Sequence, residues 1–183
     1  RFLKPGNKIL GQRLLPSLLN DSSNGAALAL AQAHPQGPQG FMRAMNANAA
    51  RLLGGWSKSY FQNPSGLTPT ATAQLPKDWL VFGDPSRRQE STAREMAQFT
   101  VKLWSDVGFR KVLAEAGVNG VGQGFFYKGG LTQAAGKTLV RRLPLTGRCE
   151  GHGLFYVAFG EGTQEQMQRF AELEEGVQGM LRE

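Results

Sequence analysis

The chain has 183 residues, 40% of them hydrophobic and 19% charged, which is the composition of a globular protein long enough for one compact domain. It contains no run of eighteen apolar residues, so the sequence predicts no membrane-spanning helix. The formal net charge is +7, yet the basic residues are scattered and do not alternate with aromatic ones, so we expect no nucleic-acid partner. The densest basic pairs, Arg87-Arg88 and Arg141-Arg142, are expected on a solvated surface.

The small number of cysteines and histidines limits the disulfides and metal sites that the chain can form. A single cysteine, Cys149, excludes a disulfide within the chain. The two histidines, His34 and His152, have no ligand-like spacing to other metal-binding residues, so we expect no metal and no other cofactor. The sequence begins at Arg1 without an initiator Met or a signal peptide, so we expect a processed product or a piece of a longer protein.

Helical patterns dominate the part of the chain from 12 to 116. Thr92 and Glu95 fit a capping box, in which the Thr side chain binds a backbone N–H at the start of a helix. Apolar residues at helical spacing predict the other helices. The expected segments are 12–20, an Ala/Leu-rich helix after the Ser22-Ser23-Asn24-Gly25 turn, 40–53, a helix that begins near Thr92, and 108–116.

The character of the sequence changes in residues 124–183. Strand-like runs at 124–128, 137–143 and 153–159 are separated by Gly-rich turns, and an amphipathic helix covers 163–181. Helices followed by an antiparallel strand group and a packing helix predict an α+β fold. We expect the whole chain to form a single domain with these two parts.

Two short stretches are candidate sites. Ser22-Ser23-Asn24 lies in a tight turn before the Ala-rich helix, and its simplest interpretation is an N-cap. Lys128-Gly129-Gly130 follows an aromatic run, and its simplest interpretation is a solvated lysine near a hairpin turn. Each stretch alone favours the simple interpretation.

Taken with their flanks, the two stretches resemble a known family. The chain resembles the serine D-alanyl-D-alanine carboxypeptidases, the low-molecular-mass penicillin-binding proteins, which share the motifs S-x-x-K, S-x-N and K-T-G with the β-lactamases. Five stretches carry the resemblance in the expected order: RFLKPG (1–6), LLPSLLNDSSNGAALALA (14–31), FQNPSGL (61–67), STAREMA (91–97) and YKGGLTQAAGKTLV (127–140). The final strand and helix also match the end of such a domain. The resemblance implies a β-lactamase/transpeptidase-like fold.

The resemblance implies acyl transfer on peptidoglycan stem peptides, with an acyl-enzyme that β-lactam antibiotics would also form. It assigns catalytic roles to three residues. Ser22 would relay a proton to the leaving amine, Asn24 would hydrogen-bond the substrate amide or the catalytic lysine, and Lys128 would orient the substrate carboxylate. The substrate backbone would pair with the strand that includes Gly129, Gly130, Leu131 and Thr132, with the Leu131 N–H as an oxyanion donor. The implied location is periplasmic or otherwise extracytoplasmic.

The chain departs from the family pattern in two places. Gly129 stands where the motif has Thr, whose hydroxyl helps to bind the terminal carboxylate. No serine of the chain has a lysine at the third following position, so S-x-x-K is absent from these 183 residues. We therefore expect the nucleophile from a missing segment or a complementary partner chain. The alternative is a non-catalytic relative that binds cell-wall peptide or a protein partner.

Overall fold

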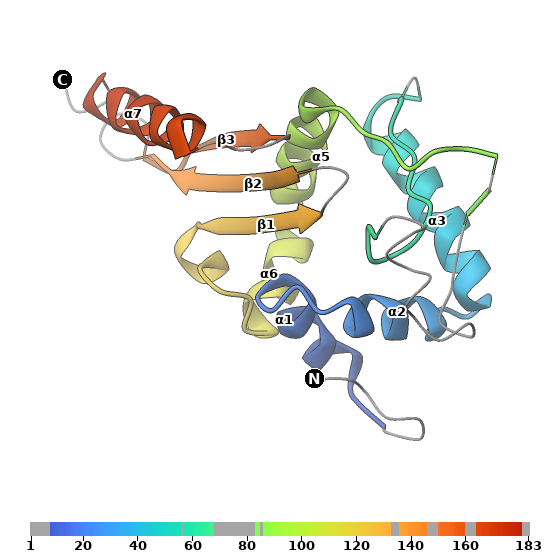
Figure 1. Ribbon diagram of the computed structural model, residues 1–183. Coiled ribbons are helices and arrows are strands. Elements are labelled where there is room, and N and C mark those ends of the chain that lie inside the picture. Colours follow the sequence, from blue (N-terminus) through green and yellow to red (C-terminus); the bar gives the residue numbers. More distant parts are fainter. Residues whose placement is uncertain are drawn as a thin grey trace. The chain divides into compact units, whose positions relative to one another are not determined.

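The structure is a computed structural model that describes residues 8–55, 57–67, 83–84, 86–132, 136–145, 150–159 and 164–180. The chain divides into two compact units, Arg1–Val118 and Asn119–Glu183. The described part of the first unit is helical, and the second carries an antiparallel sheet followed by a helix (Figure 1). The architecture is α+β, as the sequence predicted.

The helices of the first unit fall within a few residues of their predicted ranges. Pro16 lies in the first turn of its helix, where the missing N–H costs no hydrogen bond. Pro38 likewise lies at the start of the long third helix. The described elements are the 3₁₀ helix η1 (Gly11–Arg13) and the α-helices α1 (Leu14–Leu19), α2 (Asn24–Gln32), α3 (Gly37–Leu52), α5 (Ala93–Ser105) and α6 (Val107–Glu115).

Side-chain caps mark the starts of α5 and α6. Thr92 Oγ1 accepts a hydrogen bond of 3.1 Å from Glu95 N at the start of α5, which confirms that half of the predicted capping box. Asp106 accepts one of 3.0 Å from Phe109 N at the start of α6, and its negative charge also suits a helix N-terminus. Asp106 therefore both ends α5 and starts α6.

The described core of the first unit lies between α2 and α3. Leu28 of α2 is 3% exposed and Met42 of α3 is 1% exposed, and the half-buried Phe41, Met45 and Phe61 pack against them. Burying such a side chain contributes about 1.5–3 kcal/mol. Small residues on α2, among them Ala27 and Ala31, allow close approach of the neighbouring helices.

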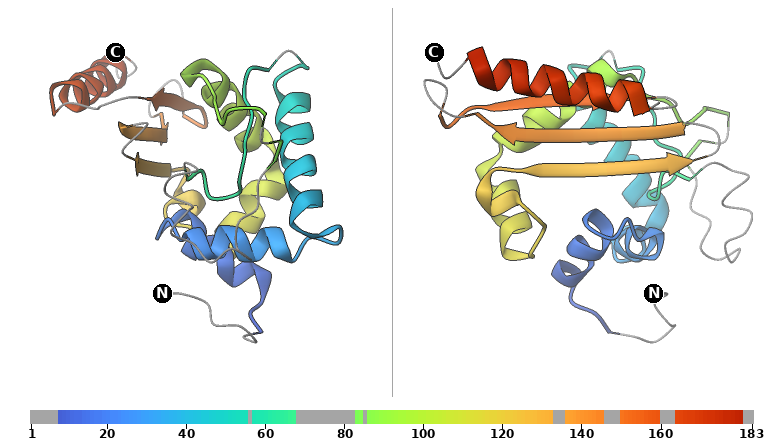
Figure 2. Two further views of the ribbon diagram at one scale, coloured as in Figure 1. Left: turned by 45° about the vertical axis from the view of Figure 1, so that its right-hand side comes forward. Right: turned by 60° about the vertical axis from the view of Figure 1, so that its left-hand side comes forward.

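Three antiparallel strands form the sheet of the second unit: β1 (Phe126–Thr132), β2 (Gly136–Pro144) and β3 (Gly153–Ala158), in the order β1-β2-β3. Lys128 pairs with Val140, and Val140 pairs with Val157 on the other side. Helix α7 (Gln164–Met180) follows β3 in the chain (Figure 2, right). The predicted strands and the predicted last helix are all present.

One predicted boundary is wrong. The sequence places a strand end at Lys128 and a glycine-rich turn after it, but β1 continues through Gly129 and Gly130 to Thr132. Cross-strand pairing of Gly129 with Leu139 and of Gly130 with Thr138 overrides the local preference of glycine for turns. Lys128 is therefore a mid-strand residue.

Arg142 also differs from its expected place on a solvated surface, because it is only 6% exposed. It lies on β2, donates through Nη1 to Gly124 O and through Nη2 to His152 O at 3.2 Å, and stands over the ring of Phe155. Backbone carbonyls and an aromatic face thus make burial of the guanidinium tolerable.

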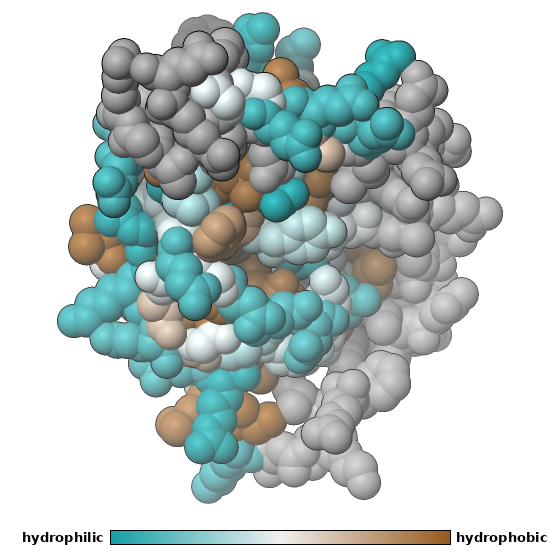
Figure 3. All heavy atoms as spheres, turned by 90° about the vertical axis from the view of Figure 1, so that its left-hand side faces the viewer, coloured by the Kyte–Doolittle hydropathy of each residue, from teal (hydrophilic) through white to brown (hydrophobic). Residues whose placement is uncertain are grey.

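The surface is mixed in character. On the face shown in Figure 3, hydrophilic side chains surround separate hydrophobic patches. Within the described residues, no helix combines the length and apolarity needed to cross a bilayer. Large hydrophobic side chains that are nevertheless exposed include Leu10, Val107 and Tyr127.

Candidate active site

The S-x-N segment forms a tight turn between α1 and α2. Two backbone hydrogen bonds build the turn, from Asn20 N to Pro16 O at 2.7 Å and from Ser23 N to Ser17 O at 2.9 Å. Ser22 at its tip has φ 53°, the only positive φ of a non-glycine residue in the part of the chain that the structure describes. An L-residue in this left-handed region costs about 1–2 kcal/mol. Such strain is concentrated at functional sites.

The two serines of the turn do different things. Ser23 is the N-cap of α2, and its hydroxyl accepts a hydrogen bond of 3.2 Å from Ala26 N. Ser22 and Asn24 are both exposed and flank this cap. The capping interpretation therefore applies to Ser23, and the two residues that the S-x-N resemblance singles out are not the ones that cap the helix.

Asn20 is a further residue of this turn that the sequence did not single out. Its Nδ2 donates a hydrogen bond of 3.2 Å to Gly117 O, which lies 97 positions away just after α6. This contact ties the turn that presents Ser22 to the end of α6. A local sequence pattern cannot predict a contact between residues that lie 97 positions apart.

Lys128 stands in the middle of β1, on the strand face that also carries Gly130 and the cross-strand partners Thr138 and Val140. Its side chain is half-buried, and Nζ donates a hydrogen bond of 2.6 Å to Gly129 O. Burial removes water from the ammonium group and lowers the pKa of Lys128. A partly desolvated cation of this kind is a stronger ligand for an anion than a solvated surface lysine.

Gly130 is required by its surroundings. A Cβ built at this position would lie 2.7 Å from Thr138 Oγ1, so any side chain would displace Thr138. Leu131 and Thr132 complete β1 opposite Lys137 and Gly136, and the structure describes only their backbone. The four predicted substrate-binding residues thus belong to one continuous strand with Lys128. Among the described strands, β1 lies at an edge of the sheet.

Comparison with known proteins identifies the family. A family model for D-alanyl-D-alanine carboxypeptidase matches residues 1–145, a range that includes the S-x-N turn and β1. The chain belongs to the D-alanyl-D-alanine carboxypeptidase family. The resemblance stated from the five sequence stretches is confirmed at this level.

A solved structure agrees with the fold. The crystal structure of the D-alanyl-D-alanine carboxypeptidase DacD from Francisella tularensis is similar with a TM-score of 0.63, at 18% sequence identity. The match covers 93% of this chain and 52% of that chain, so the present chain spans about half the length of this carboxypeptidase. A comparison with curated protein sequences finds no match.

The carboxypeptidase-like N-P-x-G-L stretch forms a loop organised by one buried side chain. Asn63 is 2% exposed, and its Nδ2 donates to Leu67 O at 2.6 Å. Its Oδ1 accepts from both the N–H and the hydroxyl of Ser65, at 3.1 and 2.9 Å. Gly66 has φ 76°, which favours glycine at this position. Gln89 Nε2 also donates to Gly66 O at 2.7 Å, so the loop is held both by Asn63 and by the segment before α5.

Glu95 has a role that the sequence did not predict. Its carboxylate accepts hydrogen bonds from Lys58 N at 2.8 Å and from Ser59 Oγ at 2.6 Å, and Ser91 Oγ lies 2.7 Å from Ser59 Oγ. The hydrogen bond from Ser59, followed by that from Lys58 N, lowers the pKa of Glu95. The Glu95 carboxylate thus holds the 57–60 segment against the start of α5 through hydrogen bonds from Lys58 and Ser59.

Proposed function

We propose that this chain supplies the S-x-N and K-T-G-type parts of a serine D-alanyl-D-alanine carboxypeptidase that acts on peptidoglycan stem peptides. The proposal rests on the family match and on two local geometries, the strained Ser22 turn and the half-buried Lys128 on β1. The nucleophilic serine and its lysine would come from polypeptide outside these 183 residues, because the chain contains no S-x-x-K.

The proposed reaction is acyl transfer in two steps. The nucleophilic serine oxygen bonds to the carbonyl carbon of the penultimate D-Ala, the peptide C–N bond breaks, and the terminal D-Ala leaves after its amine receives a proton. Ser22 would relay that proton, and Asn24 would hold the substrate amide. Water then attacks the ester, which yields the shortened peptide with a new carboxylate and restores the serine hydroxyl.

The strand β1 would hold the substrate. An extended peptide can add to an exposed strand edge through main-chain hydrogen bonds, and β1 is an edge strand among those described. In this arrangement the Leu131 N–H would stabilise the oxyanion and Lys128 would attract the terminal carboxylate. The observation that carries the proposal is the unbroken course of β1 through Lys128-Gly129-Gly130, since a plain hairpin lysine would precede a turn at these glycines.

The proposal places the activity outside the cytoplasm, where peptidoglycan is found, and makes β-lactams inhibitors that acylate the same serine. The test is labelling of the native assembly that contains this chain with a fluorescent penicillin. We expect a covalent adduct that resists denaturation, and strongly reduced labelling when Ser22→Ala or Lys128→Ala is introduced. A folded, complete assembly that never acylates would show that the enzymatic proposal is wrong.

A second candidate is a non-catalytic relative that binds cell-wall peptide or a protein partner. The specific observations that favour it are the absence of S-x-x-K from the chain and the glycine at position 129. Saturable binding of a peptide ending in D-Ala-D-Ala, with no hydrolysis and no penicillin adduct, would support this candidate over the enzyme. Hydrolysis of the same peptide by the native assembly would contradict it.

A further inference from the structure

A phenol hydroxyl occupies the space above Gly129. A Cβ built at Gly129 would lie 2.9 Å from Tyr127 Oη and 3.4 Å from two carbons of the same ring. Tyr127 and Gly129 are two residues apart on β1 and therefore share a face of the strand. The tyrosine side chain extends along the strand over the glycine, and it can do so because position 129 carries no side chain.

The ammonium of Lys128 reaches the same residue. Lys128 Nζ donates to Gly129 O at 2.6 Å, and Tyr127 Oη lies 2.9 Å from the Cβ position of Gly129, so a cation and a hydroxyl each lie beside this residue. An ammonium and a hydroxyl donor placed together are suited to a carboxylate, because hydrogen bonds to an ionised acceptor are about twice as strong as neutral ones. The two side chains leave β1 from opposite faces and meet at its glycine.

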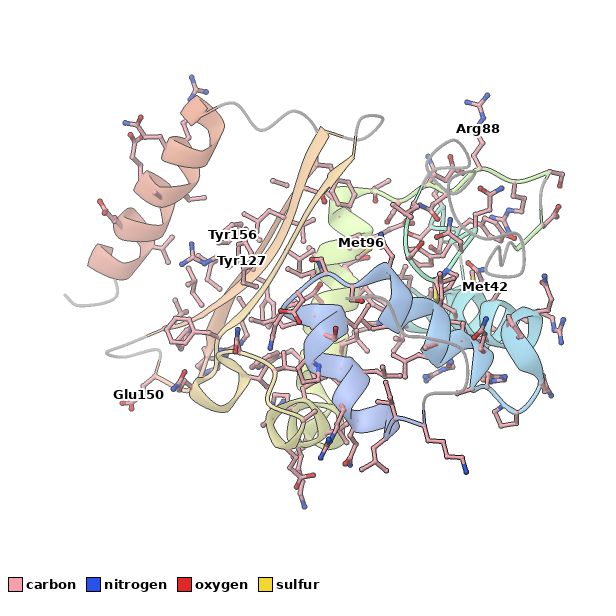
Figure 4. All side chains as sticks on the ribbon, turned by 60° about the horizontal axis from the view of Figure 1, so that its bottom comes forward. Met42, Arg88, Met96, Tyr127, Glu150 and Tyr156 are labelled. Carbon is pink, nitrogen blue, oxygen red and sulfur yellow. The ribbon has the colours of Figure 1, made fainter. Side chains whose placement is uncertain are left out.

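A third group adds positive charge on the face of Tyr127. Arg141 of β2 is the direct cross-strand partner of Tyr127, and its Nη1 donates a hydrogen bond of 3.1 Å to Tyr156 Oη on β3. Figure 4 shows Tyr127 and Tyr156 on the same side of the sheet. This row across three strands places Arg141 on the sheet face of Tyr127, with its guanidinium hydrogen-bonded to Tyr156 of β3.

We infer that the Tyr127 hydroxyl binds the terminal carboxylate of the stem peptide together with the Lys128 ammonium. The inference rests on the proposed function, since it names the group that would recognise the free carboxyl end of that substrate. Tyr127 is 61% exposed, so its side chain is accessible to a ligand. Position 129 has a glycine where the K-T-G motif has a threonine hydroxyl, and Tyr127 Oη restores a hydroxyl at that place.

One other hydroxyl near the glycines is the competing assignment. Thr138 Oγ1 lies 2.7 Å from the Cβ position of Gly130, on the strand face opposite to that of Tyr127. Thr138 is half-buried and shares the strand face of Lys128, but it covers Gly130, whereas the Lys128 ammonium contacts Gly129. The geometry favours Tyr127, and the test includes Thr138 so that the two assignments give different results.

The experiment compares two ligands, diacetyl-lysyl-D-alanyl-D-alanine and its C-terminal carboxamide, by titration calorimetry on the full chain. We expect the wild-type chain to prefer the carboxylate. Tyr127→Phe, which removes one oxygen from an exposed side chain, should weaken binding of the carboxylate about tenfold and leave the carboxamide unchanged. Gly129→Thr combined with Tyr127→Ala, which removes the ring above position 129, should restore most of the preference, and Thr138→Val should leave it intact.

Each outcome decides a separate question. If the wild-type chain binds neither peptide, the Tyr127 inference is wrong, whereas the proposed function is judged separately by penicillin labelling of the native assembly. If the wild-type chain prefers the carboxylate and Tyr127→Phe retains that preference, only the Tyr127 assignment is wrong. Loss of the preference in Thr138→Val but not in Tyr127→Phe would overturn the assignment in favour of Thr138. Melting temperatures of all variants identify any change that merely reflects unfolding.

Discussion

Ser59 Oγ donates a hydrogen bond of 2.6 Å to the Glu95 carboxylate and joins two segments that lie 36 positions apart. The same carboxylate accepts from Lys58 N at 2.8 Å, so one side chain fixes two consecutive residues of the 57–60 segment. The segment leads into the loop organised by Asn63. Glu95 therefore helps to position that loop although it belongs to helix α5.

Replacing Glu95 by Ala should destabilise the chain by about 1–2 kcal/mol, because hydrogen bonds to a charged group are lost. Chemical denaturation of the full chain measures this change. Glu115→Ala is the matched control, since Glu115 makes only an exposed ion pair of 3.8 Å with Lys111. Equal effects of the two substitutions would contradict the role assigned to Glu95.

The hydrogen bonds to Glu95 also predict a pH dependence. They lower its folded-state pKa below the ordinary 4.5, so the stabilisation is present above about pH 4.5 and is lost as pH falls through the folded pKa. Glu95→Gln should reduce this acid sensitivity. Unfolding free energies measured between neutral and acidic pH give the slope, and an unchanged slope in Glu95→Gln would count against the prediction.

Ser22 should behave as a residue held in place against its own conformational preference. Its φ of 53° suits glycine, so Ser22→Gly should be more stable than Ser22→Ala by about 1 kcal/mol. Both variants should lose penicillin labelling of the native assembly to the same degree, because both remove the hydroxyl. Thermal denaturation and labelling of the same samples separate the two effects.

The neighbouring serine provides the control for Ser22. Ser23→Ala removes the N-cap of α2 and should cost about 1 kcal/mol while leaving labelling intact. If labelling is lost in Ser23→Ala and kept in Ser22→Ala, the catalytic role belongs to Ser23 and the assignment of the two serines is wrong.

The helices and strands could be predicted because their patterns are local. Periodic apolar residues and cap residues such as Thr92 lie within the segments that they define, and the family motifs were recognised in the order in which they occur. The α+β class followed from the change from helical to strand patterns after residue 116. These features depend on neighbours in sequence, which a sequence displays directly.

The remaining features depend on contacts that sequence does not display. Glycine favours turns locally, and the pairing of Gly129 and Gly130 with Leu139 and Thr138 keeps them in a strand. Arg142 appears in sequence as half of a basic pair, yet it is buried because Gly124 O and His152 O accept its hydrogen bonds. Each of these outcomes was decided by a partner elsewhere in the chain.

The buried Arg142 side chain occupies the space that a side chain at position 153 would need. A Cβ at position 153 would lie 2.4 Å from Arg142 Cζ and 2.5 Å from Nε and Nη2, so Gly153→Ala should cost about 1–3 kcal/mol. Gly122→Ala is the control, because nothing lies within 4 Å of a Cβ built there. Chemical denaturation of the two variants should differ by most of that cost.

A double mutant tests whether Arg142 causes the effect of Gly153→Ala. When Arg142 is already replaced by Ala, the clash is absent and Gly153→Ala should cost much less than in the wild-type chain. Full additivity of the two substitutions would mean that position 153 requires glycine for another reason.

As pH rises, Lys128 should lose its affinity for anions at a lower pH than an ordinary lysine would. Burial lowers its pKa from 10.5, and only the protonated amine attracts a carboxylate. The affinity for a peptide ending in D-Ala-D-Ala should therefore fall as pH rises, with a midpoint below 10.5. Over the same interval, from the folded pKa to 10.5, the unfolded chain binds more protons than the folded one, so stability should rise with pH.

Two variants of Lys128 separate charge from shape. Lys128→Arg keeps its charge at high pH, so its peptide affinity should lack the alkaline decline even if the affinity itself is lower. Lys128→Met should bind weakly at every pH, while Lys111→Met at an exposed position should retain the wild-type profile. Calorimetric titrations at a series of pH values provide the comparison. An alkaline decline that persists unchanged in Lys128→Met would have to come from another group, because that variant has no amine at position 128 to lose a proton.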